Sequence, residues 1–368
     1  MNPLPVILRH GCKINYTLRV LRRRPDGYHD LESLFLPLSL PCDRLEIRPL
    51  PDQDGQKVES ARNAEGRPSR QARYGRPGRA PAQGLCRVEF VRAEEAGGVR
   101  EADGAREGEA LGAVHPLEGV DPADNTLTRA YAWYAARTAF APGLAIRVHK
   151  GIPMGAGLGG GSANAACLLA FLQQEAARSG LTPLSREALL SGAWQIGADV
   201  PFFILGRAAM ARGTGEILTP VPNPVAGLYL LLLCPGIGVP TGWAYAALDA
   251  ARGDAALCKK SGRPEPPEKN TKAEGSLRDL CLTGRQSQAT NSLAQAMEPA
   301  NDFEGPVFAR FPELGRLKSS LYALGAAQAG MSGTGSALFG LFRDEDMALA
   351  AMKTLASKGF AVYMQQMA

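Results

Sequence analysis

The chain has 368 residues and a mass of 39.0 kDa, with 45% hydrophobic and 21% charged side chains. This composition excludes a wholly disordered chain and supplies apolar material for roughly two domains. Lys and Arg outnumber Asp and Glu by 41 to 36, so the net charge of +5 fits an anionic small molecule as well as nucleic acid. No apolar run approaches the ~18 residues of a membrane helix, and the start MNPLPVILRHG does not resemble a secretory signal. We therefore expect a cytoplasmic protein that does not span a membrane.

The cysteines give no sign of a cross-linked or metal-bound framework. There are seven of them, without a CxxC pair, and the chain has only four histidines. A disulfide framework or a structural zinc site would need a different pattern. We interpret the thiols as reduced side chains without a catalytic role.

The first predicted element is a β-hairpin. Apolar side chains alternate with polar ones over Lys13–Val20, which predicts a strand. Pro25-Asp26-Gly27 is typical of a tight turn, because Pro fixes φ and Gly accepts a positive φ. A second strand is expected over Tyr28–Leu38.

Residues 52–113 differ in composition from the rest of the chain. The stretches 52–84 and 93–113 are rich in Gly, Arg, Glu, Ala and Pro, and they bury too little apolar surface to offset the entropy of ordering. Alternating residues around Cys86–Phe90 predict a short strand between them. The arginines suggest RNA binding as an alternative, but acidic residues nearly balance them, and we interpret the region as a poorly ordered, solvated insertion.

Helices and strands follow one another through the remaining chain. Helices are expected from Asp124-Asn125, from near Ala163 to Gly180, over Arg186–Ile196 with Ser185 as N-cap, and over Asp346–Ser357. Strands are expected over Leu144–Val148, Leu228–Cys234, Ala337–Phe342 and Phe360–Met364. A loop insertion is expected over 252–275. These elements predict an α+β protein of two lobes, residues 1–211 and 212–368.

The strongest local signal is a glycine-rich segment between a predicted strand and a predicted helix. It consists of Pro153, Met154, Gly155, Ala156, Gly157, Leu158, Gly159, Gly160, Gly161 and Ser162. Glycines let backbone N–H groups approach a polyanion, and the helix N-terminus adds its positive dipole end. The segment matches neither the P-loop nor the dinucleotide-binding pattern, so it predicts a phosphate-binding loop of another nucleotide fold; the alternative is a flexible turn. Ser162 would either cap the helix or reach Mg²⁺ or a phosphate oxygen.

Asp199 and Lys13 are the candidate catalytic pair. Asp199 lies between two apolar runs, where a carboxylate needs a cation or several hydrogen bonds, and Lys13 is a similarly isolated charge. On local sequence alone, a structural ion pair, or a loop-acceptor role for Asp199, fits equally well. A phosphate-binding loop with one Asp and one Lys is the minimum equipment for phosphoryl transfer to an alcohol.

Three separated parts of the chain resemble the GHMP kinases, and within them the branch of the non-mevalonate isoprenoid pathway. They are Cys12–Asn15 with RRPDGYH at 23–29, Pro153–Ala166 with Gly197–Phe202, and Gly330–Ser336. The RRPDGYH segment is the most specific, since other GHMP kinases share only the glycine loop. The resemblance implies a two-lobed GHMP-kinase-like fold. Its N-terminal nucleotide-binding lobe would have a ribosomal-protein-S5-like β-sheet arrangement, and its C-terminal lobe would be an α/β sandwich.

The resemblance also implies an activity, which is ATP-dependent and Mg²⁺-dependent phosphorylation of the 2-hydroxyl of 4-diphosphocytidyl-2-C-methyl-D-erythritol. Asp199 corresponds to the catalytic base and Lys13 to its partner. The other residues that the resemblance assigns are Asn15, Tyr28, His29 and Tyr245 for the substrate, Asn125, Lys150 and Ala163 for ATP, and the third-motif loop Ser332, Gly333, Thr334 and Gly335. Asn125 as a helix cap, Lys150 as an exposed strand end and a plain turn at the third motif are the alternatives.

The sequence departs from the family at two places, and two other functions stay open. Arg9–Cys12 replaces a small-residue entry before Lys13, and Ala163 stands where a second Ser is common. A GHMP kinase for homoserine or mevalonate would not need a nucleobase site at Tyr28 and His29. A catalytically silent ATP-binding regulator would not need both charges of the candidate pair. We expect a small-molecule substrate rather than nucleic acid or a membrane, and a monomer or homodimer.

Overall fold

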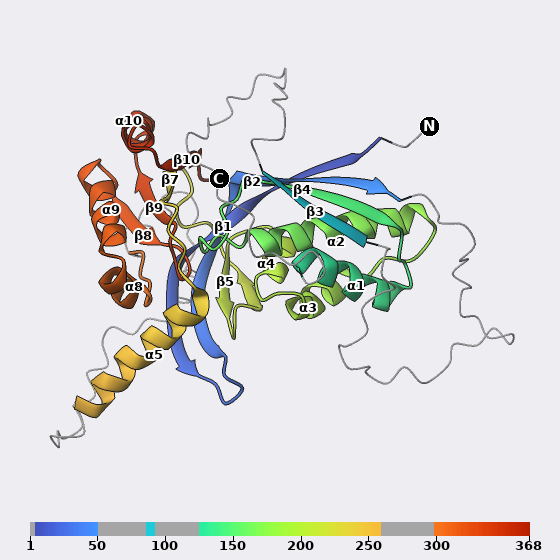
Figure 1. Ribbon diagram of the computed structural model, residues 1–368, viewed down its shortest axis with the longest axis horizontal. Helices are drawn as coiled ribbons and strands as arrows, with labels where there is room; N and C mark the ends of the chain where they lie inside the picture. Colours follow the sequence, from blue (N-terminus) through green and yellow to red (C-terminus); the bar gives the residue numbers. More distant parts are fainter. Residues whose placement is uncertain (1–3, 51–85, 93–124, 259–297) are drawn as a thin grey trace, which may run out of the picture.

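Two long antiparallel strands form a hairpin through the centre of the protein (Figure 1). In the computed structural model, which describes residues 4–50, 86–92, 125–258 and 298–368, they are β1 (Val6–Arg23) and β2 (His29–Pro49). The predicted hairpin is confirmed, although both strands are longer than expected. Their pairing has three register irregularities, which let such long strands bend without losing their partners.

The hairpin belongs to a six-stranded sheet. β1 pairs with β2, and the other neighbours follow the order β3 (Cys86–Arg92), β4 (Leu144–Lys150), β2, β5 (Ala209–Arg212) and β6 (Ile217–Pro220). β3 and β4 are parallel, and the other pairs are antiparallel. The strand predicted around Cys86–Phe90 is therefore confirmed. The rest of the predicted insertion, 52–84 and 93–113, lies outside the described residues.

Four helices cover one face of this sheet (Figure 1). They are α1 (Thr126–Thr138), α2 (Gly160–Arg178), α3 (Arg186–Gly192) and α4 (Val200–Leu205). Buried apolar side chains of the sheet and helices form one core, which includes Ile47, Ile146, Tyr131, Leu168 and Leu172. Burial of these side chains, at about 25 cal/mol per Å² of apolar surface, holds the helices on the sheet.

The helix ends follow local sequence signals. Asn125 caps α1, the Ser185 hydroxyl accepts a hydrogen bond from the Ala188 N–H, and Gly180 beyond α2 has a φ of 74°. The single helix predicted over Arg186–Ile196 is wrong in its second half. α3 ends at Gly192, a residue that disfavours a continued helix, and a 3₁₀ helix over Ala193–Gln195 follows.

The second sheet has four antiparallel strands with three helices on one face (Figure 1). In order they are β10 (Ala361–Gln366), β7 (Tyr229–Cys234), β9 (Leu338–Phe342) and β8 (Gln328–Met331), covered by α8 (Glu304–Arg310), α9 (Pro312–Ala323) and α10 (Glu345–Ala356). The predicted strands and helix of this region are confirmed. The start of the loop expected at residue 252 is wrong, because α5 (Thr241–Cys258) continues to 258. This helix contains no Pro that would end it earlier. Residues 259–275 lie outside the described part.

The other face of the second sheet packs against the hairpin. Apolar residues of β1, such as Ile14 and Tyr16, share a core with Leu232 and Phe339. Because side chains alternate along a strand, Lys13 and its polar neighbours point away from this core. β6 pairs with β5, so the first sheet extends to Pro220, and we propose that the lobe boundary expected at 211/212 falls after β6.

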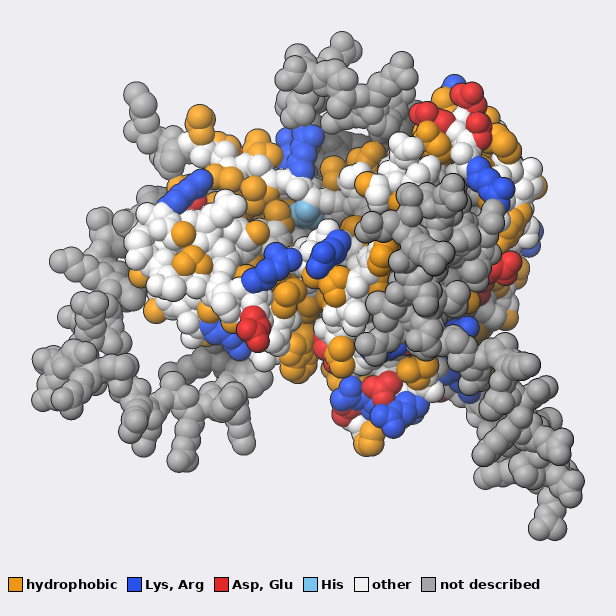
Figure 2. All heavy atoms as spheres, turned by 180° about the vertical axis from the view of Figure 1, so that it is seen from behind, with side chains coloured by type: hydrophobic (Ala, Val, Ile, Leu, Met, Phe, Trp, Pro, Cys, Tyr) orange, Lys and Arg blue, Asp and Glu red, His pale blue; other side chains and the backbone are white. Residues whose placement is uncertain are grey.

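The surface shows no single dominant feature on the face drawn in Figure 2. Lys and Arg side chains are scattered there among hydrophobic and acidic ones. Within the described residues, no helix combines the length and the apolarity needed to cross a membrane. Cys12, Cys86, Cys167 and Cys234 have free thiols, and burial raises the pKa of Cys86 and Cys167 to about 12.

Candidate active site

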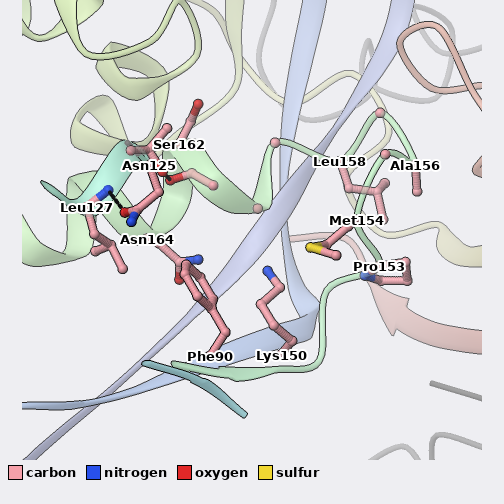
Figure 3. Close-up of a pocket in the computed structure, with 16 residues that line it drawn as sticks. Phe90, Asn125, Leu127, Lys150, Pro153, Met154, Ala156, Leu158, Ser162 and Asn164 are labelled. Carbon is pink, nitrogen blue, oxygen red and sulfur yellow. Dashed lines mark hydrogen bonds between the residues drawn. The ribbon is translucent and has the colours of Figure 1, made fainter. Parts of the chain in front are cut away.

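The glycine-rich segment 153–162 connects β4 to α2 and lines a pocket (Figure 3). Gly155, Gly157 and Gly159 have φ values of 65°, 77° and 73°, which glycine adopts far more readily than other residues. Residues 160–162, the first turn of α2, also line the pocket, so the unpaired N–H groups at this helix start lie beside the space. The arrangement is suited to holding a polyanion.

The third-motif loop packs directly against the glycine loop. The Ser332 hydroxyl donates to the Gly157 carbonyl at 3.0 Å and accepts from the Asn15 N–H at 3.1 Å. A Cβ on Gly157 would lie 2.3 Å from the Ser332 carbonyl oxygen, and one on Gly333 would lie 3.1 Å from the Gly157 Cα. Only glycines allow the two loops to approach this closely. Thr334 and Gly335 complete the turn, where the Thr334 hydroxyl lies 3.3 Å from that of Thr241.

Lys13 and Asp199 lie side by side next to the glycine loop. Lys13 Nζ is 3.4 Å from an Asp199 carboxylate oxygen and also donates to Asn15 Oδ1. The Lys13 side chain is 5% exposed and that of Asp199 26%, so the pair is open to solvent on the carboxylate side. The Lys13 N–H donates to the Leu158 carbonyl, which ties β1 to the loop. Asp199 precedes α4 but makes no cap hydrogen bond there, so the helix does not occupy its carboxylate.

Aromatic residues also lie near Asp199. Tyr245 of α5 stacks on His29, with ring centroids 4.6 Å apart and planes inclined by 28°. Burial raises the pKa of Tyr245, and the nearby negative charge of Asp199 raises it further. Tyr28, the residue before His29, is 66% exposed. Of the predicted substrate residues, Tyr245 therefore lies near Asp199, and Asn15 contacts its partner Lys13.

Lys150 belongs to a buried network that the sequence did not reveal. In Figure 3 its side chain extends into the space between Phe90 and Met154. Its ammonium donates to Asp43, which has no exposed surface and also accepts from the N–H groups of Gly151 and Ile152 at 2.9 Å. The Asn164 amide adds a fourth donor at 3.0 Å. Lys150 is thus a positioned cation at the pocket floor rather than an exposed strand end.

We expect Asp43→Ala to lower the free energy of unfolding by about 3–5 kcal/mol, because the buried Lys150 ammonium and two backbone donors lose their acceptor. Urea denaturation measures the change. Glu89→Ala, which breaks an exposed pair with Arg147, is the control and should cost about 1 kcal/mol or less. Equal losses in the two variants would contradict a structural role for the buried carboxylate.

His10 lies next to this network. His10 belongs to the segment Arg9–Cys12, where the family usually has small residues. Its Nε2 is 2.7 Å from Oδ1 of Asn164, whose amide nitrogen contacts Asp43. Burial lowers the pKa of His10, against the raising effects of a hydrogen bond to Gly11 and of the Asp43 charge. A neutral ring is the form that this position favours.

The remaining predicted residues occupy different places. The Asn125 side chain accepts from the N–H groups of Leu127 and Thr128, so it caps α1 while lining the pocket. Ser162 is the third residue of α2, where Gly159 and not Ser162 is the N-cap. Ala163 is 1% exposed and is not among the residues that line the pocket. Phe90, Thr126, Leu127 and Asn164, which were not among the predicted site residues, also line it.

Comparisons with known proteins give the family of the chain. Residues 125–207 match the model of the GHMP kinases N terminal domain, and 282–360 match that of the GHMP kinases C terminal. A 4-diphosphocytidyl-2-C-methyl-D-erythritol kinase of Nitratidesulfovibrio vulgaris, strain Hildenborough, is 38% identical over 358 residues, 97% of each chain. The chain belongs to this kinase family. The relative of the same name in Solidesulfovibrio magneticus is 37% identical over 98% of each chain.

Solved structures agree with this family. A crystal structure of 4-(cytidine 5'-diphospho)-2C-methyl-D-erythritol kinase has a TM-score of 0.60 and 27% identity over 98% of each chain. Homoserine kinase from Cytophaga hutchinsonii has a TM-score of 0.57 at 15% identity over 99% of this chain and 94% of that one, which shows a shared fold. The predicted GHMP kinase family and two-lobed α+β fold are confirmed. The chain is accordingly a phosphotransferase that acts on an alcohol group, and GHMP kinase membership implies ATP as the donor.

Proposed function

We propose that the chain phosphorylates the 2-hydroxyl of 4-diphosphocytidyl-2-C-methyl-D-erythritol with ATP, as the names of its relatives suggest. The observation that supports this most is that the Lys13–Asp199 pair lies next to the glycine loop and near Tyr245, which stacks on His29. A phosphate-binding loop and aromatic rings near one carboxylate fit a donor polyphosphate and a nucleobase-bearing acceptor.

In this proposal, Asp199 orients the acceptor hydroxyl and takes its proton as the oxygen–phosphorus bond forms. The transition state of phosphoryl transfer is loose, so the proton leaves late and a carboxylate of ordinary basicity suffices. Lys13 pairs with the Asp199 carboxylate and offsets charge on the transferred group. Backbone N–H groups of the glycine loop and of the first turn of α2 hold the phosphates.

Mg²⁺ is the metal that we propose for this site. Within the described residues, no group of three or more His, Cys, Asp and Glu side chains could hold a metal by itself. Mg²⁺ usually binds one or two protein oxygens together with substrate phosphates, and it would neutralise phosphate charge here. Ser162 fits such a partial set, because it lies in the first turn of α2 and lines the pocket.

The remaining proposals concern the substrate residues and the setting of the enzyme. Tyr28 stacks on the cytosine, His29 bonds to it, and Asn15 and Tyr245 contact the rest of the substrate. We propose a cytoplasmic monomer or homodimer with a small-molecule substrate.

The test is ADP release measured with the cytidyl substrate, homoserine and mevalonate side by side. We expect turnover of the cytidyl substrate to exceed that of the other two by about 10³-fold or more, because only it has a base for the aromatic site. Turnover of homoserine or mevalonate alone would overturn the proposed substrate. Absence of turnover with all three would favour the silent ATP-binding regulator.

A further inference from the structure

Asp249 of α5 contacts the His29 side chain at the start of β2. One carboxylate oxygen of Asp249 accepts from His29 Nε2 at 2.9 Å. The imidazole is 8% exposed and is held from one face by its stack on Tyr245. Asp249 follows Tyr245 by four residues on the helix, so one face of α5 presents both the stacking ring and the carboxylate.

The carboxylate determines which ring nitrogen of His29 carries a proton. An ionised carboxylate only accepts hydrogen bonds, so Nε2 must carry the hydrogen and, in the neutral ring, Nδ1 is left as an acceptor. Within the described residues, Nδ1 makes no hydrogen bond. Every fully buried side-chain nitrogen or oxygen there has a partner, so the unpartnered Nδ1 is not fully buried. Nδ1 is therefore an acceptor that a ligand can still reach.

We propose that Asp249 is a positioning residue that makes His29 select a base with an exocyclic amine. Cytosine presents an N4 amine, which donates, whereas uracil presents an O4 oxygen, which only accepts. A lone pair on Nδ1 pairs with the amine and repels the oxygen, so the fixed tautomer rejects a uridyl substrate. This inference rests on the proposed function, because it assigns the base to the His29 site, and it adds the residue that sets base preference.

Arg23 separates this role from a purely structural one. Its guanidinium lies 3.8 Å from the other Asp249 carboxylate oxygen and is 66% exposed. Arg23→Ala removes a charge from the same carboxylate without touching the imidazole. Asp249→Ala removes the acceptor from His29 Nε2, so the ring is free to adopt the other tautomer, with Nδ1 as a donor.

The experiment measures the dissociation constants of CDP and UDP by calorimetry, at about pH 8, where an ordinary imidazole is neutral. A saturating non-hydrolysable ATP analogue blocks the donor site. We expect the wild type and Arg23→Ala to prefer CDP by about 10-fold or more, and Asp249→Ala to lose most of this preference. Nitrogen-15 NMR of the wild type should show a protonated Nε2 and an unprotonated Nδ1 in His29, and this measurement does not depend on the variant folding.

Three results would overturn the inference: equal affinities of the wild type for CDP and UDP, an unchanged preference in Asp249→Ala, or a protonated Nδ1 in the wild type. Equal weakening of both nucleotides in Asp249→Ala would show that the carboxylate only ties the hairpin to α5. The proposed function fails by a different result, which is the absence of ADP release with the cytidyl substrate. An active wild type with an unchanged base preference in the variant would therefore disprove only the role of Asp249.

Discussion

Asp199→Asn should lower turnover by about 10²-fold or more while ATP affinity stays within a few-fold. The amide keeps the size of the side chain but does not accept the proton of the acceptor hydroxyl. We propose that the glycine loop, 153–162, which lines the pocket, makes most of the ATP contacts, so donor binding has no reason to change. Steady-state turnover and the dissociation constant of a non-hydrolysable ATP analogue are the two measurements.

Two controls accompany this variant. Asp346→Asn, an exposed acidic residue in the first turn of α10, should leave turnover unchanged. Thermal unfolding of Asp199→Asn shows whether loss of the carboxylate beside the buried Lys13 also weakens the fold. Normal turnover in the Asn variant would remove Asp199 from the mechanism and leave it as the structural partner of Lys13.

Gly157→Ala is expected to lower turnover by at least about 10-fold and the free energy of unfolding by about 2–4 kcal/mol. Its Cβ would meet the Ser332 carbonyl oxygen at 2.3 Å, so the glycine loop and the third-motif loop would have to separate. This movement would displace the backbone N–H groups that we propose to hold the phosphates, so we expect weaker ATP binding. Urea denaturation and the KM for ATP report the two effects.

Gly155→Ala provides the matched control for this clash. Gly155 also has a positive φ, of 65°, but its Cβ would meet nothing within 4 Å. Both variants therefore share the backbone strain of a left-handed residue, about 1 kcal/mol, and only Gly157→Ala adds the collision. Equal effects in the two variants would mean that the close approach of the two loops is unimportant.

The sequence predicted which helices and strands are present better than it predicted where they begin and end. Alternation identified β1 only where it is regular, since bulges interrupt the pattern over the longer strand. The α3 region looked like one helix because its apolar spacing continues past Gly192. Composition placed a loop at residue 252, whereas α5 continues to 258.

The candidate site could be predicted where the signal is local. Lys13 and Asp199 stood out as isolated charges among apolar residues, and the glycine loop by composition. Asp43 could not be found in this way, because its partners Lys150 and Asn164 are more than one hundred residues away in sequence. Asp249 follows Tyr245, a predicted substrate residue, by four positions. Helical spacing could therefore have placed Asp249 on the same face as Tyr245.

The β1–β2 hairpin has a consequence for how substrates enter. Its apolar face is built into the second sheet, while its other face carries Lys13 and its turn region carries His29. A rigid rotation of one half of the enzyme against the other would have to tear this shared packing apart. We therefore expect substrates to reach the reacting groups by local rearrangement of side chains, while the shared packing of the hairpin and the second sheet stays in place.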